Sequence, residues 1–274
     1  MPRNERPTAV PHLARTFSYD RGAVGTAELR SVAVETAVEI AFGGAPFAVM
    51  MASPSDLEDF AYGFALTEAG IAPSDIVSVE ATFSNGSARL NVTLRGSALS
   101  AYLSRRRALA GRTGCGVCGL EDLSQLRPLP RRAAIKRTIA PQAIGAAVQK
   151  LDAAQPLNAL TRAVHAAAWC DLDGSLVFVR EDVGRHNALD KLIGALLRDG
   201  ADPERGFILI TSRCSYEMVA KAVRFGARTL VAVSAPTSLA LQMAEDTGLD
   251  LIAIARADRA LSFLTLEANR GEAA

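Results

Sequence analysis

The sequence has little of several features that mark common protein classes. Its 30 basic and 29 acidic residues leave a net charge of only +1, so the overall charge does not favour nucleic-acid binding. No segment approaches the roughly 20 uninterrupted apolar residues that cross a bilayer. The N-terminal segment lacks the apolar run of a signal peptide. We therefore expect a cytoplasmic protein that binds neither nucleic acid nor membrane.

Cysteine and lysine are also scarce, with four residues of each in 274. Four cysteines, only two of them closely spaced, do not form the framework of a disulfide-stapled secreted fold, so reducing conditions fit better. The basic residues are mostly arginine, whose guanidinium matches the geometry of phosphate and carboxylate groups. Because alanine is enriched as well, we favour genome composition as the explanation for the excess of arginine over lysine. Since the net charge is near zero, any anion site must be local.

The most informative feature present is a glycine-rich segment with two thiols, residues 111–119 (Gly-Arg-Thr-Gly-Cys-Gly-Val-Cys-Gly). Four glycines in nine residues cannot sustain a helix or strand, so Cys115 and Cys118 are expected on a mobile loop. Nearby guanidinium groups, including those of residues 105–107, stabilise a thiolate over a thiol. They are expected to lower a cysteine pKa from about 8.5, which suits sulfur chemistry.

Other meanings of a Cys-x-x-Cys pair fit less well. A structural zinc site would need a second close pair of ligands beside Cys115 and Cys118, and the sequence has none, so no metal is expected. A thioredoxin-like motif stands at a helix N-terminus directly after a strand, and the flanking glycines argue against that. Cys170 and Cys214 lie singly in segments that read as regular structure and are predicted to be core residues.

The length predicts two domains, and composition divides the chain into four parts. These are a disordered tail at residues 1–24, a small α+β domain at 25–104, a mobile connector with the thiols at 105–130 and an α/β domain at 131–274.

Hydrophobic alternation in the first domain predicts a strand over residues 32–42, a Gly43-Gly44 hairpin turn and a second strand over 46–51. Ser53 as N-cap and Pro54 at the first helical position predict a helix that ends at Gly70. Two further strands follow, at residues 76–82 and 88–94, with a tight reversal at Asn85-Gly86.

In the second domain a helix is expected after Pro141, and then strands and helices alternate. The strands are expected at 162–170, 175–180, 207–212, 228–234 and 249–255, and the helices at 187–198, 215–225 and 236–247. This alternation predicts a layered α/β domain with largely parallel strand pairing.

Several arginines lie at the ends of predicted strands of this domain: Arg180, Arg185, Arg213, Arg256 and Arg259. Ligands of open α/β sheets bind beyond the carboxyl ends of the strands, so these arginines are candidates to hold a phosphate-bearing ligand. The alternative, held about equal, is that the arginines pair with Glu181, Asp182 and Asp258 on a solvated rim. For His186 we favour a loop-anchoring hydrogen bond over a role as general acid or base.

Four segments occur here in one order: the thiol loop and residues 180–191, 215–222 and 234–240. Collectively they resemble the formate dehydrogenase accessory sulfurtransferase family, called FdhD, and the resemblance covers nearly the whole chain from about Glu35. It implies a C-terminal domain with the three-layer cytidine-deaminase-like fold. The zinc site of that fold is absent, because the sequence lacks a deaminase's His-x-Glu and Pro-Cys-x-x-Cys.

The resemblance also implies a function. Members of the family accept persulfide sulfur from a cysteine desulfurase and pass it to the molybdenum or tungsten bis(molybdopterin guanine dinucleotide) cofactor before that cofactor enters formate dehydrogenase. By this resemblance Cys115 carries the persulfide and Cys118 assists, by proton transfer or by disulfide formation. A cysteine desulfurase and formate dehydrogenase are the expected partners, a homodimer is the expected assembly, and GDP is a possible mimic of the cofactor.

The resemblance places cofactor binding in one segment, Ile254, Ala255, Arg256, Ala257, Asp258 and Arg259, to which Arg185, His186 and Arg213 are added as candidates. The chain departs from the family pattern at Ser212, where glycine is usual, and at Ile254, where an aromatic is usual. Both departures are expected to affect cofactor affinity more than sulfur transfer. Two rival functions stay open, a non-catalytic cofactor-binding chaperone and a thiol oxidoreductase.

Overall fold

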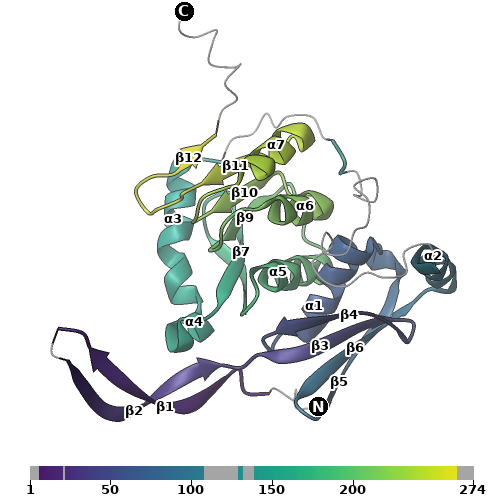
Figure 1. Cartoon of the computed structure of the whole chain (residues 1–274). Coiled ribbons are helices and arrows are strands. Elements are labelled where there is room, and N and C mark those ends of the chain that lie inside the picture. The colour runs from purple at the N-terminus through teal and green to yellow at the C-terminus, as the bar shows by residue number, and fades with distance from the viewer. Residues whose placement is uncertain (1–5, 21, 108–128, 132–138, 264–274) are drawn as a thin grey trace, which may run out of the picture.

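The structure of the chain is a computed structural model that describes residues 6–20, 22–107, 129–131 and 139–263. Within these residues the strands form a two-stranded ribbon, a four-stranded sheet and a six-stranded sheet (Figure 1). None of the helices in the described part of the chain is long and apolar enough to span a membrane.

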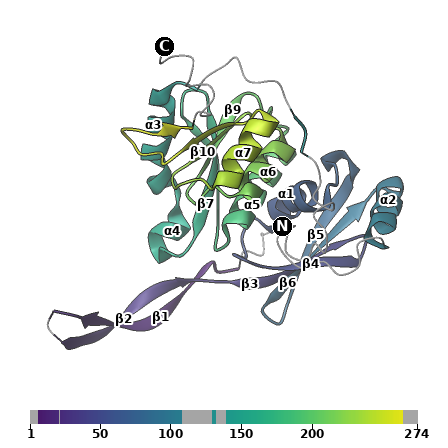
Figure 2. The same ribbon diagram turned by 45° about the horizontal axis from the view of Figure 1, so that its top comes forward.

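The two-stranded ribbon consists of β1 (Ala9–Ser18) and β2 (Ala23–Ala33), which pair antiparallel. In Figures 1 and 2 the ribbon extends away from the two larger sheets. Residues 9–18 fall in the segment 1–24 that the sequence assigns to a disordered tail, and for them this prediction is wrong. The physical reason is that β2 supplies a partner strand, so an antiparallel ladder satisfies the backbone groups of residues 9–18.

The four-stranded sheet has the order β4 (Ala45–Ala52), β3 (Thr36–Phe42), β6 (Ser87–Leu94) and β5 (Ile76–Ser84). Both predicted hairpins are confirmed: Gly43 and Gly44 link β3 to β4 with φ angles of 57° and 79°, and Asn85 and Gly86 link β5 to β6 with 47° and 77°. The single strand predicted over residues 32–42 is instead divided between β2 and β3.

Helix α1 (Leu57–Phe64) continues into a π-helical segment, η1 (Ala65–Ala69), and packs on this sheet. Gly70, with φ 63°, ends the helix as predicted. The predicted start at Ser53 and Pro54 is wrong, because the helix begins only after Asp56. The hydroxyl of Ser53 does not cap the helix, since it accepts a hydrogen bond of 3.2 Å from the N–H of Val183, a residue 130 positions further along the chain.

The six-stranded sheet and the helices around it form the second unit of the chain. This unit confirms the predicted alternation of helices and strands. Its helices are α3 (Pro141–Leu151), α4 (Pro156–Thr161), α5 (Arg185–Asp199), α6 (Tyr216–Phe225) and α7 (Ser238–Thr247). Its sheet has the order β12 (Leu261–Ser262), β11 (Asp250–Ala253), β10 (Thr229–Ala232), β9 (Gly206–Ile210), β7 (His165–Asp171) and β8 (Leu176–Asp182).

The expectation of largely parallel pairing is wrong. Only β9, β10 and β11 pair in parallel, whereas β7 is antiparallel to both β8 and β9, and β12 is antiparallel to β11. The chain passes from β7 to β8 through a turn closed by the hydrogen bond from the N–H of Gly174 to the carbonyl of Asp171, and such a short connection joins antiparallel strands.

This unit has three layers. Helices α5, α6 and α7 pack on one face of the six-stranded sheet, and α3 packs on the other. Cys170 and Cys214 lie in the two resulting cores, as predicted, and burial raises the pKa of each thiol to about 12. Their thiols are therefore neutral at physiological pH.

The two larger units are joined by direct contact between the backbones of α1 and α5. A Cβ atom built on Gly63 would lie 1.8 Å from the carbonyl oxygen of Asp190, and one built on Gly194 would lie 1.8 Å from that of Asp59. Only glycine fits at such a distance. In both views α1 lies between α5 and the four-stranded sheet (Figure 2).

Helix α2 (Gly96–Arg107) leads into the predicted connector. The connector was expected to begin at residue 105, but the helix continues to Arg107, so its first three residues are helical. Cys115 and Cys118 lie outside the described residues, and the expected mobility of their loop stays a prediction. On the far side of that segment, Leu129 packs against the core between the six-stranded sheet and helices α5 to α7.

Candidate functional site

The carboxyl ends of four strands, β8, β9, β10 and β11, lie along the same side of the six-stranded sheet. We call this row of strand ends the sheet edge. Asp182 at the end of β8 pairs with His165 at the start of β7, and Ile210 at the end of β9 pairs with Ala167 of β7. Because β9, β10 and β11 are parallel, the loops that follow β8, β9, β10 and β11 all leave from this edge. Helices α5, α6 and α7 begin in these loops, so their N–H groups and partial positive charges point to the same edge.

The predicted arginines share this edge but do not form one cluster. Arg185 follows β8 and Arg256 follows β11, and four strand spacings of about 4.8 Å separate these two strands, roughly 19 Å in all. Arg213, after β9, lies between them and is exposed. The edge therefore has two ends with different surroundings.

At the β11 end, residues 254–259 form a tight turn that reverses the chain toward β12. Ile254 has a φ of 53°, which is rare for a β-branched residue. The N–H of Arg256 donates to the carbonyl of Arg259 at 2.7 Å and closes the turn. The Arg256 guanidinium donates to the carbonyls of Val233 at 2.5 Å and Ala255 at 2.8 Å, which directs it along the ends of β10 and β11.

A cavity of about 570 Å³ lies between this turn and α3. Arg256, Asp258 and Arg259 line one side of it, and Gln142 and Gly145 of α3 line another. A Cβ atom on Gly145 would lie 2.8 Å from the carbonyl oxygen of Ala257, so glycine allows the close approach of the turn to the helix. The volume is in the range of small-molecule sites, and the two exposed guanidiniums are suited to an anionic ligand.

The opposite end of the edge, at the start of α5, is desolvated. The Nε atom of Arg185 and the Nε2 atom of His186 are buried without a hydrogen-bond partner in the described part of the chain. Burial, together with the charges of Lys221 and Arg185, lowers the pKa of His186 to about 4. The imidazole is therefore neutral at pH 7. The anchoring hydrogen bond favoured from sequence is not made through Nε2.

The alternative in which acidic neighbours pair with the arginines is not supported for Glu181 and Asp182. Glu181 accepts hydrogen bonds from the N–H groups of Leu157 and Asn158 at 2.9 and 2.7 Å, and Asp182 pairs with Lys191 at 2.7 Å. Of the arginines at the strand ends, Arg180 forms ion pairs with Asp59 at 2.8 Å and with Asp56 at 3.5 Å. No ion pair among the described residues involves the other four: Arg185, Arg213, Arg256 and Arg259.

The two positions that depart from the family pattern both affect the edge. The hydroxyl of Ser212 donates to the carbonyl of Arg213 at 3.0 Å, so its side chain turns into its own loop. Ile254 occupies the left-handed backbone position at the start of the 254–259 turn. Neither position presents an aromatic ring or a bare backbone to a ligand.

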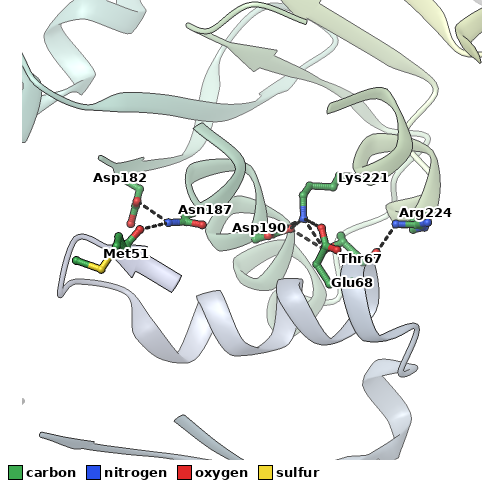
Figure 3. A network of polar contacts seen from close by, with 8 residues as sticks. All are labelled: Met51, Thr67, Glu68, Asp182, Asn187, Asp190, Lys221 and Arg224. Atoms are coloured by element: carbon green, nitrogen blue, oxygen red, sulfur yellow. Dashed lines mark hydrogen bonds and ion pairs between the residues drawn. The ribbon is translucent and has the colours of Figure 1, made fainter. Parts of the chain in front are cut away.

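Sequence reasoning missed two buried polar clusters that connect this edge to the N-terminal unit (Figure 3). In the first, the ammonium of Lys221, only 2% exposed, donates to Asp190 at 2.7 Å, to Thr67 at 3.0 Å and to Glu68 at 2.5 Å. Burial acts to lower the pKa of Lys221, but Asp190 and Glu68 hold it above its usual value. Arg224 also donates to the carbonyl of Thr67.

In the second cluster, Asn187 donates to the carbonyl of Met51 at 2.7 Å and to Asp182 at 3.0 Å (Figure 3). Lys191, fully buried, donates to the carbonyl of Ser53 at 2.9 Å. The sequence carries only a partial signal for these clusters. Positions 186 and 190, and positions 187 and 191, carry polar residues four apart, so each pair shares one face of α5, but the partners of these residues in the N-terminal unit are not indicated.

Within the described residues no three His, Cys, Asp or Glu side chains gather as metal ligands. Cys115 and Cys118, the predicted catalytic residues, lie outside those residues, so their role stays a prediction.

The sequence model of the FdhD/NarQ family matches residues 33–267. A sulfur carrier protein FdhD of Xanthomonas euvesicatoria pv. vesicatoria (strain 85-10) is 46% identical over 257 residues, covering 93% of this chain and 90% of that protein. The protein of the same name from Variovorax paradoxus (strain S110) is 46% identical over 232 residues, covering 83% and 82%.

Among solved structures, a putative formate dehydrogenase accessory protein from Desulfotalea psychrophila superposes with a TM-score of 0.74 at 24% identity, covering 95% of this chain and 99% of that one. This similarity shows a shared fold. Together with the match over residues 33–267, it establishes what the motifs of the sequence predicted: the chain belongs to the FdhD/NarQ family.

Proposed function

We propose that this protein is a sulfur carrier for formate dehydrogenase. In this proposal Cys115 accepts persulfide sulfur from a cysteine desulfurase and passes it to the molybdenum or tungsten bis(molybdopterin guanine dinucleotide) cofactor before that cofactor enters the dehydrogenase. The observation that supports it best is the sheet edge, where unpaired arginines border a cavity of about 570 Å³ in a protein 46% identical to sulfur carriers.

The first step is an exchange between sulfur atoms. The Cys115 thiolate attacks the outer sulfur of the desulfurase persulfide, a new S–S bond forms on Cys115, and the desulfurase cysteine leaves as a thiolate. No net oxidation occurs. The arginines of the thiol loop and its flanks favour the thiolate that this attack requires.

Delivery of that sulfur as sulfide requires two electrons. Attack of the Cys118 thiolate on the Cys115 sulfur forms a disulfide between the two cysteines and releases the outer sulfur as sulfide, which balances the electrons. A dithiol reductant must then restore both thiols. This route gives Cys118 the disulfide role among the two that the sequence left open.

The cofactor is the substrate of this reaction, and the sheet edge is proposed to hold its nucleotide ends. Arg256 and Arg259 at the cavity offer charge-assisted hydrogen bonds to phosphate, and the N-termini of α5, α6 and α7 add partial positive charge. Arg185, Arg213 and His186 complete the proposed contact surface. We infer that the three-layer unit is a cytidine-deaminase-like scaffold that binds a nucleotide without a zinc site.

Mass spectrometry tests the proposal. After incubation with a cysteine desulfurase and cysteine, the wild-type protein is expected to gain about 32 Da, one sulfur atom, on the peptide that contains Cys115. The matched control is Cys118→Ala, which should retain the adduct because it lacks only the releasing thiol. A protein that binds the cofactor but never carries the adduct would instead be a cofactor-binding chaperone, and the carrier proposal would be wrong.

A further inference from the structure

Helix α3 carries a glycine in its interior, Gly145, although three other positions of the same helix are alanine. Glycine destabilises the interior of a helix relative to alanine, because it loses more conformational freedom on folding. The backbone of Gly145 does not need that freedom, since its φ lies outside the left-handed region. The glycine therefore calls for an explanation outside the helix.

That explanation lies in the turn of residues 254–259. A Cβ atom built on Gly145 would lie 2.8 Å from the carbonyl oxygen of Ala257, whereas ordinary van der Waals contact begins at 3.4 Å. An alanine at position 145 would therefore force a displacement of about 0.6 Å. Gly145 and Ala257 both line the cavity of about 570 Å³, together with Arg256 and Arg259. The missing side chain thus brings the helix and the turn into direct contact at the wall of the candidate site.

The helix side of this contact is fixed, whereas the turn side is free to move. Ile144, Ala147 and Leu151 of α3 are buried in the core between this helix and the six-stranded sheet. Residues 256–259 of the turn are all exposed. A close-packed core resists displacement. A methyl group at position 145 would therefore move the turn and leave α3 in place.

The start of the turn is held independently of α3. Ile254 has a φ of 53°, a left-handed conformation that persists in a β-branched residue only where its surroundings enforce it. The N–H of Ala255 donates to the carbonyl of Ala232 at 3.1 Å and ties the turn to the end of β10. These contacts define where the turn begins, and the contact with Gly145 defines the position of its middle.

We propose that Gly145 is a positioning residue for the nucleotide end of the cofactor. By admitting the Ala257 carbonyl to the surface of α3, it holds the turn where the guanidinium of the preceding residue, Arg256, borders the cavity. Groups that bind a ligand must be held within about 0.5 Å of the productive geometry, and the displacement caused by alanine is of this size. The inference rests on the proposed function, in which Arg256 holds a phosphate group.

Isothermal titration calorimetry with GDP tests the proposal. Gly145→Ala should weaken GDP binding by about tenfold, the effect of losing one charge-assisted hydrogen bond. Its melting temperature should stay within about 3 °C of the wild-type value, because the exposed turn yields and alanine favours the helix. The matched control is Gly96→Ala, which adds the same methyl group to α2 with nothing within 4 Å of it, and it should bind GDP like the wild type.

A double variant shows whether Gly145 acts through Arg256. Gly145→Ala/Arg256→Ala should bind GDP about as weakly as Arg256→Ala alone, because the same contact is lost in both proteins. Equal GDP affinity of the wild type and Gly145→Ala would overturn the proposal and leave the sulfur carrier function unaffected. A double variant whose loss is the product of the two single losses would do the same.

The wild-type titration separates this inference from the function on which it rests. A wild type that binds no GDP would overturn the positioning role together with the nucleotide site of the proposed function. The persulfide adduct on the Cys115 peptide tests the carrier step separately, since its formation does not require a nucleotide.

Discussion

The two ends of the functional sheet edge are built in opposite ways. At the start of α5, His186 and Arg185 have buried nitrogens and lie beside two buried polar clusters that bind the N-terminal unit. At the end of β11, Arg256 and Arg259 are exposed and line an open cavity. Buried contacts hold the α5 end in place, whereas the side chains at the β11 end are exposed, so the two ends should respond differently to substitution.

The largest difference should come from the cluster around Lys221. Replacing Lys221 by Met leaves Asp190, 1% exposed, buried without its cation, and removing one partner of a buried pair costs about 3–5 kcal/mol. Urea denaturation should show a loss of this size. Arg256→Ala, at the open end, should change the free energy of unfolding by less than about 0.5 kcal/mol.

A double variant separates the contribution of charge to the stability of this cluster from the contribution of side-chain packing. In Lys221→Met/Asp190→Leu both charges of the Lys221–Asp190 pair are removed, and only the Glu68 carboxylate, whose side chain is 10% exposed, is left without its cation. Part of the lost stability should therefore return. If the double variant is as unstable as the single one, the cluster contributes through shape rather than through its ion pair.

The next largest effect is a dependence of the free energy of unfolding on pH, which comes from His186 at the start of α5. The folded-state pKa of His186 is about 4, below its ordinary value of 6.5, so between these values the unfolded chain binds more protons than the folded one. The contribution of His186 to stability should therefore fall as the pH is lowered from 7 to 5, while Asp190, whose pKa burial raises to about 6, changes stability in the opposite direction in both the wild type and a His186 variant. After allowance for partial exposure, His186 contributes about 1–2 kcal/mol to this loss.

Thermal or urea unfolding at the two pH values measures this effect, with His186→Gln as the test variant. The glutamine side chain does not titrate, so its stability should fall less over the same interval. An equal pH dependence in both proteins would show that His186 is not held neutral by its surroundings.

The smallest expected effect lies at the open end and concerns binding rather than stability. Arg256→Ala should weaken GDP binding by about tenfold, or 1.4 kcal/mol, because one charge-assisted hydrogen bond is lost. Isothermal titration calorimetry measures it, with Arg162→Ala as a control, since Arg162 is exposed and lies outside the cavity lining. Equal affinities of wild type and Arg256→Ala would remove Arg256 from the site.

Much of the second unit could be predicted because its signals are local. The helices α5, α6 and α7 each end at a glycine, Gly200, Gly226 and Gly248, in the left-handed conformation, and buried apolar runs mark the strands between them. The Gly43-Gly44 and Asn85-Gly86 hairpins are likewise set by two adjacent residues each. These elements could be predicted from the sequence because adjacent residues decide their conformation.

The rest depends on partners far away in the sequence. The helix after Ser53 begins late because Ser53 bonds to residues 182 and 183 of the other unit. The direction of β7 and the strand at residues 9–18 likewise depend on which strand pairs with them. The buried clusters around Lys221 and Asn187 require β4 and η1 of the N-terminal unit to lie against α5 and α6, and no local pattern specifies that contact.

The central claim, that Cys115 carries the sulfur, is tested most directly by co-expressing Cys115→Ala with a formate dehydrogenase. The account predicts a soluble, folded variant with unchanged GDP affinity and no activation of the dehydrogenase, because the loop thiol acts in chemistry rather than in packing. Cys170→Ser, which alters a buried thiol of the core, should lower stability yet retain activation. Full activation by Cys115→Ala would contradict the account.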